Sequence, residues 1–204
     1  MHTLRVLHVY DDAEERSAAM NMALDEALFE LAAAPSLRFY RWRQPSLSFG
    51  YFGRYADVAD QQATREIVRR WTGGGVVLHG TDLTYSVILP ARDDTKLPPS
   101  REIYAAIHDA VRQALTSHVA ASLAQRDAPK LSEACFANPV AADVMVGERK
   151  IAGAAQRRTR AGLLQQGSIQ YDKLPTDFRE SFAAAICPAS KQKNFAPEML
   201  RHAQ

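Results

Sequence analysis

A run of three glycines between two apolar stretches constrains this chain more than any other feature of its sequence. Residues 69–79 read RRWTGGGVVLH, so two arginines precede the glycines and His79 ends the run. Because glycine has no Cβ, the backbone can adopt positive φ angles and a ligand can approach the main chain closely. The guanidinium groups of Arg69 and Arg70 suit a carboxylate or a phosphate. The run predicts a strand, a tight turn and a second strand, forming either a ligand site or a glycine-rich hairpin with its arginines in water.

Length and charge limit the classes of protein to which this chain can belong. With 204 residues, 47% of them hydrophobic, the chain is long enough for one domain with a buried core, and a single domain over residues 1–204 is predicted. The formal net charge of +2 gives no reason to expect a nucleic acid as partner. Local basic clusters at residues 65–70 and 149–160 are better suited to an anionic small molecule or an acidic protein surface.

The cysteine content and the apolar runs bear on the cellular compartment. Two cysteines, Cys135 and Cys187, are too few for a disulfide framework, so both are expected to be thiols. The N-terminus lacks the apolar core of a signal peptide, and no apolar run is long enough to span a bilayer. A soluble cytoplasmic protein without membrane contact is predicted.

The hydrophobic pattern predicts an α+β fold in which a mixed, mostly antiparallel sheet packs with helices. Strands are expected at residues 4–10, 37–42, 47–52, 67–70, 76–79, 83–89, 143–146, 149–156 and 163–171. Helices are expected at residues 18–34, 57–66, 100–123 and 176–186. The strands at 37–42 and 47–52 are expected to pair around a turn at 44–45, and residues 143–156 to form a hairpin that turns at 147–148.

The first predicted helix has a clear start and a clear apolar face. Ser17 precedes it as a plausible N-cap, and Met20, Leu24, Leu28 and Leu31 recur at helical spacing. The polar residues Asn21, Asp25 and Glu26 are expected to lie largely away from that apolar face.

Two residues outside the glycine run could carry chemistry. Lys150 is followed by small residues on a predicted strand, where it could hold a carbonyl or phosphate oxygen, although a surface lysine is the commoner outcome for its type. Cys135 falls in a predicted loop at residues 125–138. It is either an inert buried thiol or a nucleophile whose pKa a nearby lysine lowers.

Three stretches, in this order, resemble the signatures of the lipoate-protein ligase and octanoyltransferase family. Residues 21–27 (NMALDEA) are similar to the first helix of that family, and residues 69–79 with 83–86 (LTYS) are similar to its glycine-rich signature. Residues 149–156 (RKIAGAAQ), followed by 166–168 (QGS), resemble the second signature with its lysine. Gln165 and Gln166 stand where the family usually has at least one histidine before the glycine.

The resemblance implies a fold, a reaction and partners. The fold would be shared with the biotin protein ligases. The reaction would place an octanoyl or lipoyl group on a lysine of a lipoyl carrier domain or of a glycine-cleavage H-type protein. An acyl carrier protein is a possible donor.

The resemblance also assigns roles to residues at matching positions. Cys135 and Lys150 would be catalytic, and Lys150 would bind the carboxyl or thioester carbonyl. Arg70 would sit at the polar end of an acyl tunnel walled by the glycines and His79. The implied substrate-binding residues are Arg70, Gly73, Gly74, Gly75, His79, Asp143, Gly153, Ala154, Gly167 and Ser168.

The family has two catalytic branches. Ligases activate lipoate with ATP and Mg, and commonly need a further C-terminal domain or partner chain, whereas this sequence stops at Gln204. Transferases need no cofactor and pass the acyl group through a cysteine thioester. Residues 134–139 (ACFANP) look like the cysteine loop of octanoyltransferases typical of Gram-positive bacteria, which favours Cys135. Another transferase branch places its cysteine later, roughly at Cys187, but with a different order of cysteine and proline. A lipoyl-binding module without transfer activity is a third reading.

Overall fold

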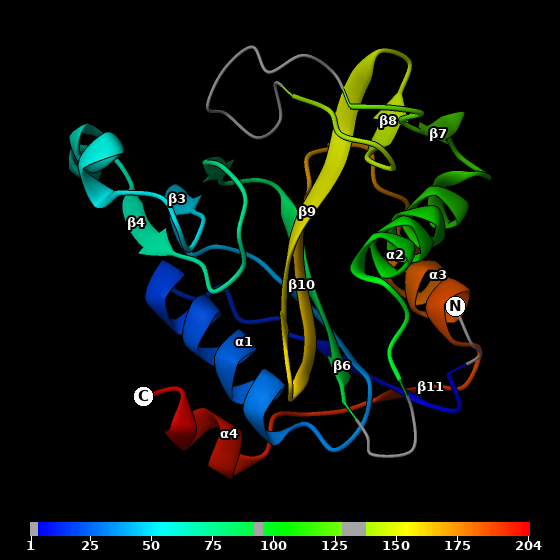
Figure 1. Ribbon diagram of the computed structural model, residues 1–204, viewed down its shortest axis with the longest axis horizontal. Helices are drawn as coiled ribbons and strands as arrows, with labels where there is room; N and C mark the ends of the chain where they lie inside the picture. The colour runs from blue at the N-terminus through cyan, green and yellow to red at the C-terminus, as the bar shows by residue number, and fades with distance from the viewer. Residues whose placement is uncertain (1–3, 92–95, 128–137) are drawn as a thin grey trace.

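The computed structural model describes residues 4–91, 96–127 and 138–204, and an eight-stranded sheet is its largest element (Figure 1). The strand order is β11-β1-β2-β6-β10-β9-β8-β7. Strand β1 runs parallel to β2 and β11, and every other pair in this sheet is antiparallel. The predicted mixed, mostly antiparallel sheet is therefore confirmed. The strands are β1 (Leu7–Asp11), β2 (Ser36–Tyr40), β6 (Leu83–Pro90), β7 (Ala121–Leu123), β8 (Val144–Val146), β9 (Arg149–Thr159), β10 (Gly162–Ile169) and β11 (Ser190–Gln192).

Helices cover both faces of this sheet. Helices α2 (Ser100–Leu115) and α3 (Phe178–Ile186) pack together on one face, and α1 (Ala18–Leu31) lies on the other with the short α4 (Pro197–His202) beside it (Figure 1). The main apolar core lies under α2 and α3, where the ring of Phe182 makes an edge contact with Tyr85 at 5.2 Å between centroids. The face under α1 is more polar, and the pocket described below lies on it.

A second, three-stranded sheet carries the glycine run. Its order is β4 (Glu66–Arg69), β3 (Ser46–Phe49), β5 (Val77–His79), with β3 parallel to β4 and antiparallel to β5. The predicted strands before and after the glycines are both present. They do not pair with each other, because β3 lies between them, so the run is not a hairpin.

The predicted pairing of strands 37–42 and 47–52 is wrong. A strand has two edges, and both edges of β2 are already hydrogen-bonded to β1 and β6, so β3 cannot join it. The side chain of Trp42 lies at the crossing between the two sheets. Its Nε1 donates to Oγ1 of Thr84 at 2.7 Å, and the chain then leaves for the small sheet.

Two predicted helices differ from the structure, and one predicted hairpin is confirmed. The helix expected at 57–66 is a pair of 3-10 turns, η1 (Tyr55–Asp57) and η2 (Ala59–Ala63). The helix expected at 100–123 ends at Leu115, because residues 121–123 pair with β8 as strand β7. The hairpin between β8 and β9 is confirmed, and Gly147 occupies its turn with a φ of 57°. Within the described residues, no helix is long and apolar enough to cross a membrane.

Helix α1 confirms its predicted cap but not its predicted polar face. The Ser17 hydroxyl accepts a hydrogen bond from the Met20 amide at 3.3 Å. Asn21 and Asp25, expected to lie away from the apolar face, are fully buried. The reason is Arg38 on β2, whose guanidinium donates to Asp25 Oδ1 at 2.9 Å and to Asn21 Oδ1 at 2.8 Å. A buried cation needs such partners, so the polar side of the helix faces inward.

Candidate active site

A pocket lies where the small sheet, helix α1 and strands β9 and β10 meet. It brings together side chains from segments that are far apart in the sequence. Six of the residues singled out from the sequence line it: Arg70, His79, Gly153, Ala154, Gly167 and Ser168. Its other lining residues are Met22, Tyr40, Trp42, Ser48, Val77, Thr84, Ala155 and Gln166.

The glycine run packs beside the pocket, backbone against backbone, but Gly73, Gly74 and Gly75 are not among the residues that line it. Gly74 has a φ of 86°, a conformation that side chains rarely adopt. A Cβ on Gly74 would lie 3.3 Å from the Cβ of Ala155 on β9, and a Cβ on Gly50 would collide with the Gly74 carbonyl oxygen. The glycines therefore allow the loop to approach both β9 and the end of β3.

Arg70 fixes the loop from inside. One terminal nitrogen, Nη1, donates to the Ser48 carbonyl oxygen at 2.8 Å and to Ser48 Oγ at 2.7 Å. The other, Nη2, donates to the carbonyl oxygens of Gly73 at 3.1 Å and Gly75 at 2.8 Å. Arg70 is buried, whereas Arg69 is exposed and donates to backbone oxygens at residues 51 and 53. Of these two arginines, Arg70 lines the pocket and Arg69 does not.

Lys150 is buried and is not the surface lysine that its residue type would favour. Its Nζ lies 2.8 Å from Oδ2 of Asp143, and both side chains are almost fully excluded from solvent. A Cβ on Gly153 would lie only 2.7 Å from this Nζ and would meet the Cε of the lysine. Gly153 therefore provides the space that the lysine side chain occupies, directly beside the pocket.

Two residues on α2 that sequence reasoning missed hold Asp143 in place. The Tyr104 hydroxyl donates to Asp143 Oδ1 at 2.5 Å, and His108 Nδ1 donates to the Ala142 carbonyl oxygen at 2.8 Å. Burial lowers the pKa of His108 to about 4, so its ring is neutral at pH 7. Tyr104 follows the buried Ile103, and His108 follows the buried Ile107. Their positions beside the apolar residues of the helix are the sequence signal from which their inward orientation could have been predicted.

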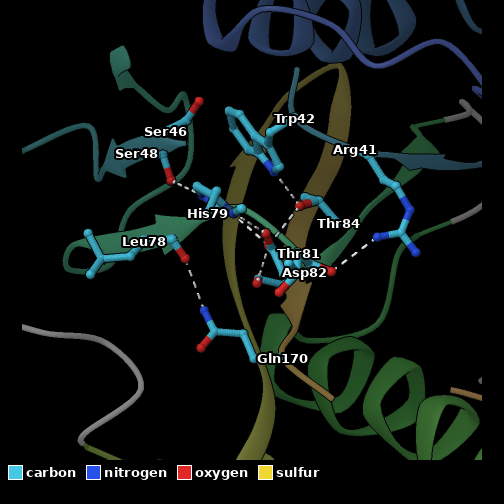
Figure 2. A network of polar contacts seen from close by, with 12 residues as sticks. Arg41, Trp42, Ser46, Ser48, Leu78, His79, Thr81, Asp82, Thr84 and Gln170 are labelled. Carbon is cyan, nitrogen blue, oxygen red and sulfur yellow. Dashed lines mark hydrogen bonds and ion pairs between the residues drawn. The ribbon is translucent and has the colours of Figure 1, made fainter. Parts of the chain in front are cut away.

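His79 stands at the centre of a second polar network (Figure 2). Its Nε2 lies 2.7 Å from Ser48 Oγ, its Nδ1 lies 2.8 Å from Asp82 Oδ2, and the Trp42 ring stacks on it with centroids 4.0 Å apart. Burial lowers the pKa of His79. Although burial favours the protonated form of Asp82, the hydrogen bonds from His79 and Ser168 lower the pKa of this carboxyl.

Those protonation states fix the direction of each hydrogen bond. An ionised Asp82 only accepts, so Nδ1 of the neutral His79 carries the proton and donates to it. The unprotonated Nε2 then accepts from the Ser48 hydroxyl. Ser48 and Asp82 were not predicted as site residues, because neither belongs to one of the three recognised sequence motifs.

Gln166 occupies the place where a family histidine was expected. Its Oε1 accepts from the Thr72 hydroxyl at 2.8 Å, and its Nε2 donates to Asp25 Oδ2 at 2.7 Å. The amide thus connects the segment before the glycines to helix α1. Gln165 faces elsewhere and donates to the Tyr85 hydroxyl at 3.3 Å.

Of the two cysteines, Cys187 lies within the described residues. Cys135 lies outside the described residues, three positions before Asn138. Cys187 is buried in the apolar core at the end of α3, where its Sγ donates to the Leu4 carbonyl oxygen at 3.1 Å, and it does not line the pocket. Among residues 4–91, 96–127 and 138–204, no group of three or more His, Cys, Asp or Glu side chains is arranged to hold a metal ion.

The fold and this site define a lipoate-type acyl ligase or transferase domain. Residues 17–202 match the lipoyl protein ligase A/B catalytic domain, and the chain belongs to that family. The resemblance seen in the three sequence motifs is therefore confirmed.

Individual proteins of this family are similar to the chain in sequence or in fold. The octanoyltransferase LipM of Oceanobacillus iheyensis is 37% identical over 164 residues, which cover 76% of this chain and 60% of the relative. That of Bacillus cereus is 35% identical over 202 residues, covering 90% and 71%. The chain thus spans between 60% and 71% of the length of these two relatives. A structure of lipoate-protein ligase A bound with ATP has the same fold, with a TM-score of 0.72 and 20% identity over 100% of this chain and 93% of that one.

Proposed function

We propose that this protein is an octanoyltransferase that moves an octanoyl or lipoyl group from a thioester donor, through a thioester on Cys135, to a lysine of a carrier domain. One observation carries the proposal. The buried Lys150–Asp143 ion pair lies directly behind Gly153 on the wall of a largely apolar pocket. The similarity to LipM octanoyltransferases supports the choice of reaction.

The pocket suits an extended acyl chain. Its lining includes the apolar side chains of Met22, Trp42 and Val77, and small residues from β9 and β10 cover the remaining wall. Small and absent side chains leave a slot for a narrow apolar group, and burial of each methylene contributes about 0.8 kcal/mol to binding. The glycines at 73–75 do not line this slot themselves; they hold Arg70, which does, through the carbonyl oxygens of Gly73 and Gly75.

Lys150 supplies positive charge where the reacting carbonyl would lie. Asp143 fixes the position of its ammonium group, because Oδ2 lies 2.8 Å from the lysine Nζ and both side chains are buried. A fixed cation stabilises the oxyanion that forms when a nucleophile attacks a thioester carbonyl. A cation beside a thiol favours the thiolate, and this is the activation that the proposed reaction requires of Cys135.

The proposed reaction has two balanced steps. The Cys135 thiol releases its proton and attacks the donor carbonyl as the thiolate, the carbon–sulfur bond of the donor breaks, and the departing donor thiolate takes up that proton. The ε-amine of the carrier lysine then attacks the Cys135 thioester, forms the amide, and returns a proton to the cysteine sulfur. The energy comes from the thioester bond, so neither ATP nor Mg is required.

The partners follow from this chemistry. An acyl carrier protein would supply the thioester. A lipoyl carrier domain, or a glycine-cleavage H-type protein, would supply the lysine. Cys135 is preferred to Cys187 because the Cys187 thiol is committed to a buried hydrogen bond within the apolar core.

Incubation with octanoyl-acyl carrier protein, followed by intact-mass measurement, tests the proposal. We expect one thioester-linked octanoyl group on the wild type, removed by hydroxylamine at neutral pH, absent from Cys135→Ala and kept in Cys187→Ala. Addition of a lipoyl carrier domain should move the octanoyl group to that domain without ATP. Modification that requires both free lipoate and ATP would instead assign a ligase. Binding of octanoate with neither activity would assign a binding module.

A further inference from the structure

We propose that Ser48, His79 and Asp82 form a second nucleophilic centre in the same pocket, one that takes an acyl group as an ester on Ser48 and releases it to water. This inference rests on the proposed function in one respect, which is that acyl groups bind in this pocket. The activity it adds is hydrolysis of a medium-chain acyl thioester to the free acid, which transfer to a carrier lysine does not require.

The three side chains form a continuous chain of hydrogen bonds from the nucleophile to the base to an ionised carboxylate. Ser48 Oγ lies 2.7 Å from His79 Nε2, and His79 Nδ1 lies 2.8 Å from Asp82 Oδ2 (Figure 2). Since Asp82 accepts from Nδ1, the free lone pair of His79 is on Nε2 and faces the serine hydroxyl. This is the arrangement in which an imidazole removes the proton of an attacking serine.

The aspartate and the imidazole are both held rigidly. Asp82 Oδ2 also accepts from Ser168 Oγ at 2.6 Å and from Thr84 Oγ1 at 3.1 Å, and Oδ1 accepts from the Gly80 amide at 3.0 Å. The Trp42 ring stacks on His79 with an interplanar angle of 20° and fixes the ring plane. A base whose orientation is set by its surroundings is suited to catalysis, because little reorganisation is needed during reaction.

The serine is polarised from a second direction. Arg70 Nη1 donates to Ser48 Oγ at 2.7 Å, so a guanidinium lies on one side of the oxygen and the imidazole on the other. The guanidinium favours negative charge on the oxygen as its proton leaves. Ser48 sits on β3, a strand paired on both edges, and it lines the pocket together with His79 and Arg70.

The register of the large sheet places this centre and Lys150 at the same level of the pocket. Thr84 on β6 pairs with Ser168 on β10, which pairs with Gly153 on β9. The first two hold Asp82, and the third provides the space for the lysine. An acyl group that occupies the pocket therefore lies between two centres able to act on its carbonyl.

The step balances without any added oxidant or metal. Ser48 Oγ attacks the thioester carbonyl while its proton passes to His79 Nε2. The carbon–sulfur bond breaks, and the thiolate leaves with that proton, which gives an ester on Ser48. Water then attacks the ester carbonyl, His79 takes a proton from the water and returns it to Ser48 Oγ, and the carboxylic acid departs.

Reaction with an alkyl fluorophosphonate tests the serine directly, since this probe phosphonylates activated serines with loss of fluoride. The protein is used in the Cys135→Ala background, so the cysteine cannot contribute. We expect one alkylphosphonyl group, placed on Ser48 by peptide mapping, with the labelling rate lowered by about 100-fold or more in His79→Gln. Ser46→Ala is the matched control. Its hydroxyl lies two positions earlier on β3, donates to the Gln44 carbonyl oxygen at 2.8 Å, and should leave labelling unchanged.

Hydrolysis of octanoyl-coenzyme A by the same Cys135→Ala protein is the second measurement. We expect thiol release that is lost when Ser48→Ala is added and retained when Ser46→Ala is added. A folded protein whose Ser48 takes no phosphonyl group, or whose thioester hydrolysis persists in Ser48→Ala, would overturn the proposal. Both measurements use a protein without Cys135. If Ser48 proves unreactive, the proposed transfer through Cys135 is therefore unaffected. If transfer through Cys135 fails, phosphonylation and thioester hydrolysis still test Ser48.

Discussion

The Cα of Gly153 lies so close to the side chain of Lys150 that a Cβ there would stand 2.7 Å from the lysine Nζ. The glycine and the lysine are three positions apart on β9, and the lysine side chain fills the space that the missing Cβ leaves. The second sequence motif, RKIAGAAQ, thus combines the charged group with the void that accommodates it. This relationship explains why glycine occupies position 153.

Gly153→Ala should therefore displace Lys150 while leaving most of the fold intact. A shift of about 1 Å in a catalytic group can cost about 100-fold in rate, and we expect a loss of that order in octanoyl transfer. Gly80→Ala is the control, because a Cβ at Gly80 meets no atom within 4 Å. Transfer to a carrier domain, followed by intact mass, and a thermal melt provide the two measurements. A Gly153→Ala protein with undiminished transfer would show that the position of the lysine is unimportant.

The Lys150–Asp143 pair should be strongly coupled in stability. Replacing one member of a buried ion pair leaves the other charge without that partner, which typically costs about 3–5 kcal/mol. We expect Asp143→Asn and Lys150→Met each to lower the free energy of unfolding by a value in that range. The double variant should lose less than the sum, because no uncompensated charge remains. Urea unfolding of the four proteins measures the coupling, and additive losses would indicate that the two side chains do not interact.

His108 should make stability depend on pH between 6.5 and about 4. Its pKa is lowered in the folded protein by burial, with Asp143 raising and Lys150 lowering it to smaller extents. In that window the unfolded chain binds a proton that the folded protein does not, so stability falls as the pH falls. The expected loss is about 3 kcal/mol between pH 7 and pH 4.

The comparison of two histidine variants isolates this contribution. Asn at position 108 keeps an N–H donor for the Ala142 carbonyl but cannot gain a proton, so His108→Asn should remove the loss assigned to this ring. His118→Asn replaces a half-exposed histidine on the surface and should leave the pH dependence as in the wild type. Urea unfolding at pH 7.0, 5.5 and 4.5 gives the three curves. Parallel curves for wild type and His108→Asn would contradict the assignment.

Local patterns in the sequence predicted more of this fold than long-range pairing did. Helical spacing identified α1, and a strand-like run identified β6, because both signals lie within one element. The partners of Asn21 and Asp25 could not be inferred, since the cation that draws them inward, Arg38, comes from a strand that contacts the helix only in the folded protein. The same limit applies to β3, whose neighbours are fixed by which strand edges remain unpaired.

In the site, too, contiguous motifs could be recognised from the sequence and long-range contacts could not. Lys150 and the glycines are recognisable because each motif is contiguous. The contact between Ser48 and His79 joins residues 31 positions apart, and that between Tyr104 and Asp143 joins residues 39 apart. No periodicity or composition signals such a pair. Both pairs consist of polar groups in buried surroundings, where every donor and acceptor needs a partner.

Arg70→Lys should separate the charge of Arg70 from its geometry. The arginine donates to two oxygens of Ser48 and to the carbonyl oxygens of Gly73 and Gly75, whereas an ammonium group has three donors in a different arrangement. At least one buried acceptor loses its partner, at a cost of about 1–3 kcal/mol in unfolding free energy. We expect octanoyl transfer to fall together with stability, because Arg70 lines the pocket and the glycine loop beside it is no longer tied to β3. Arg69→Lys is the control, since that side chain is exposed, and it should change neither quantity by a comparable amount. Equal stability of the Arg70→Lys and Arg69→Lys proteins would show that charge alone, without the fork of the guanidinium, is enough to hold the loop.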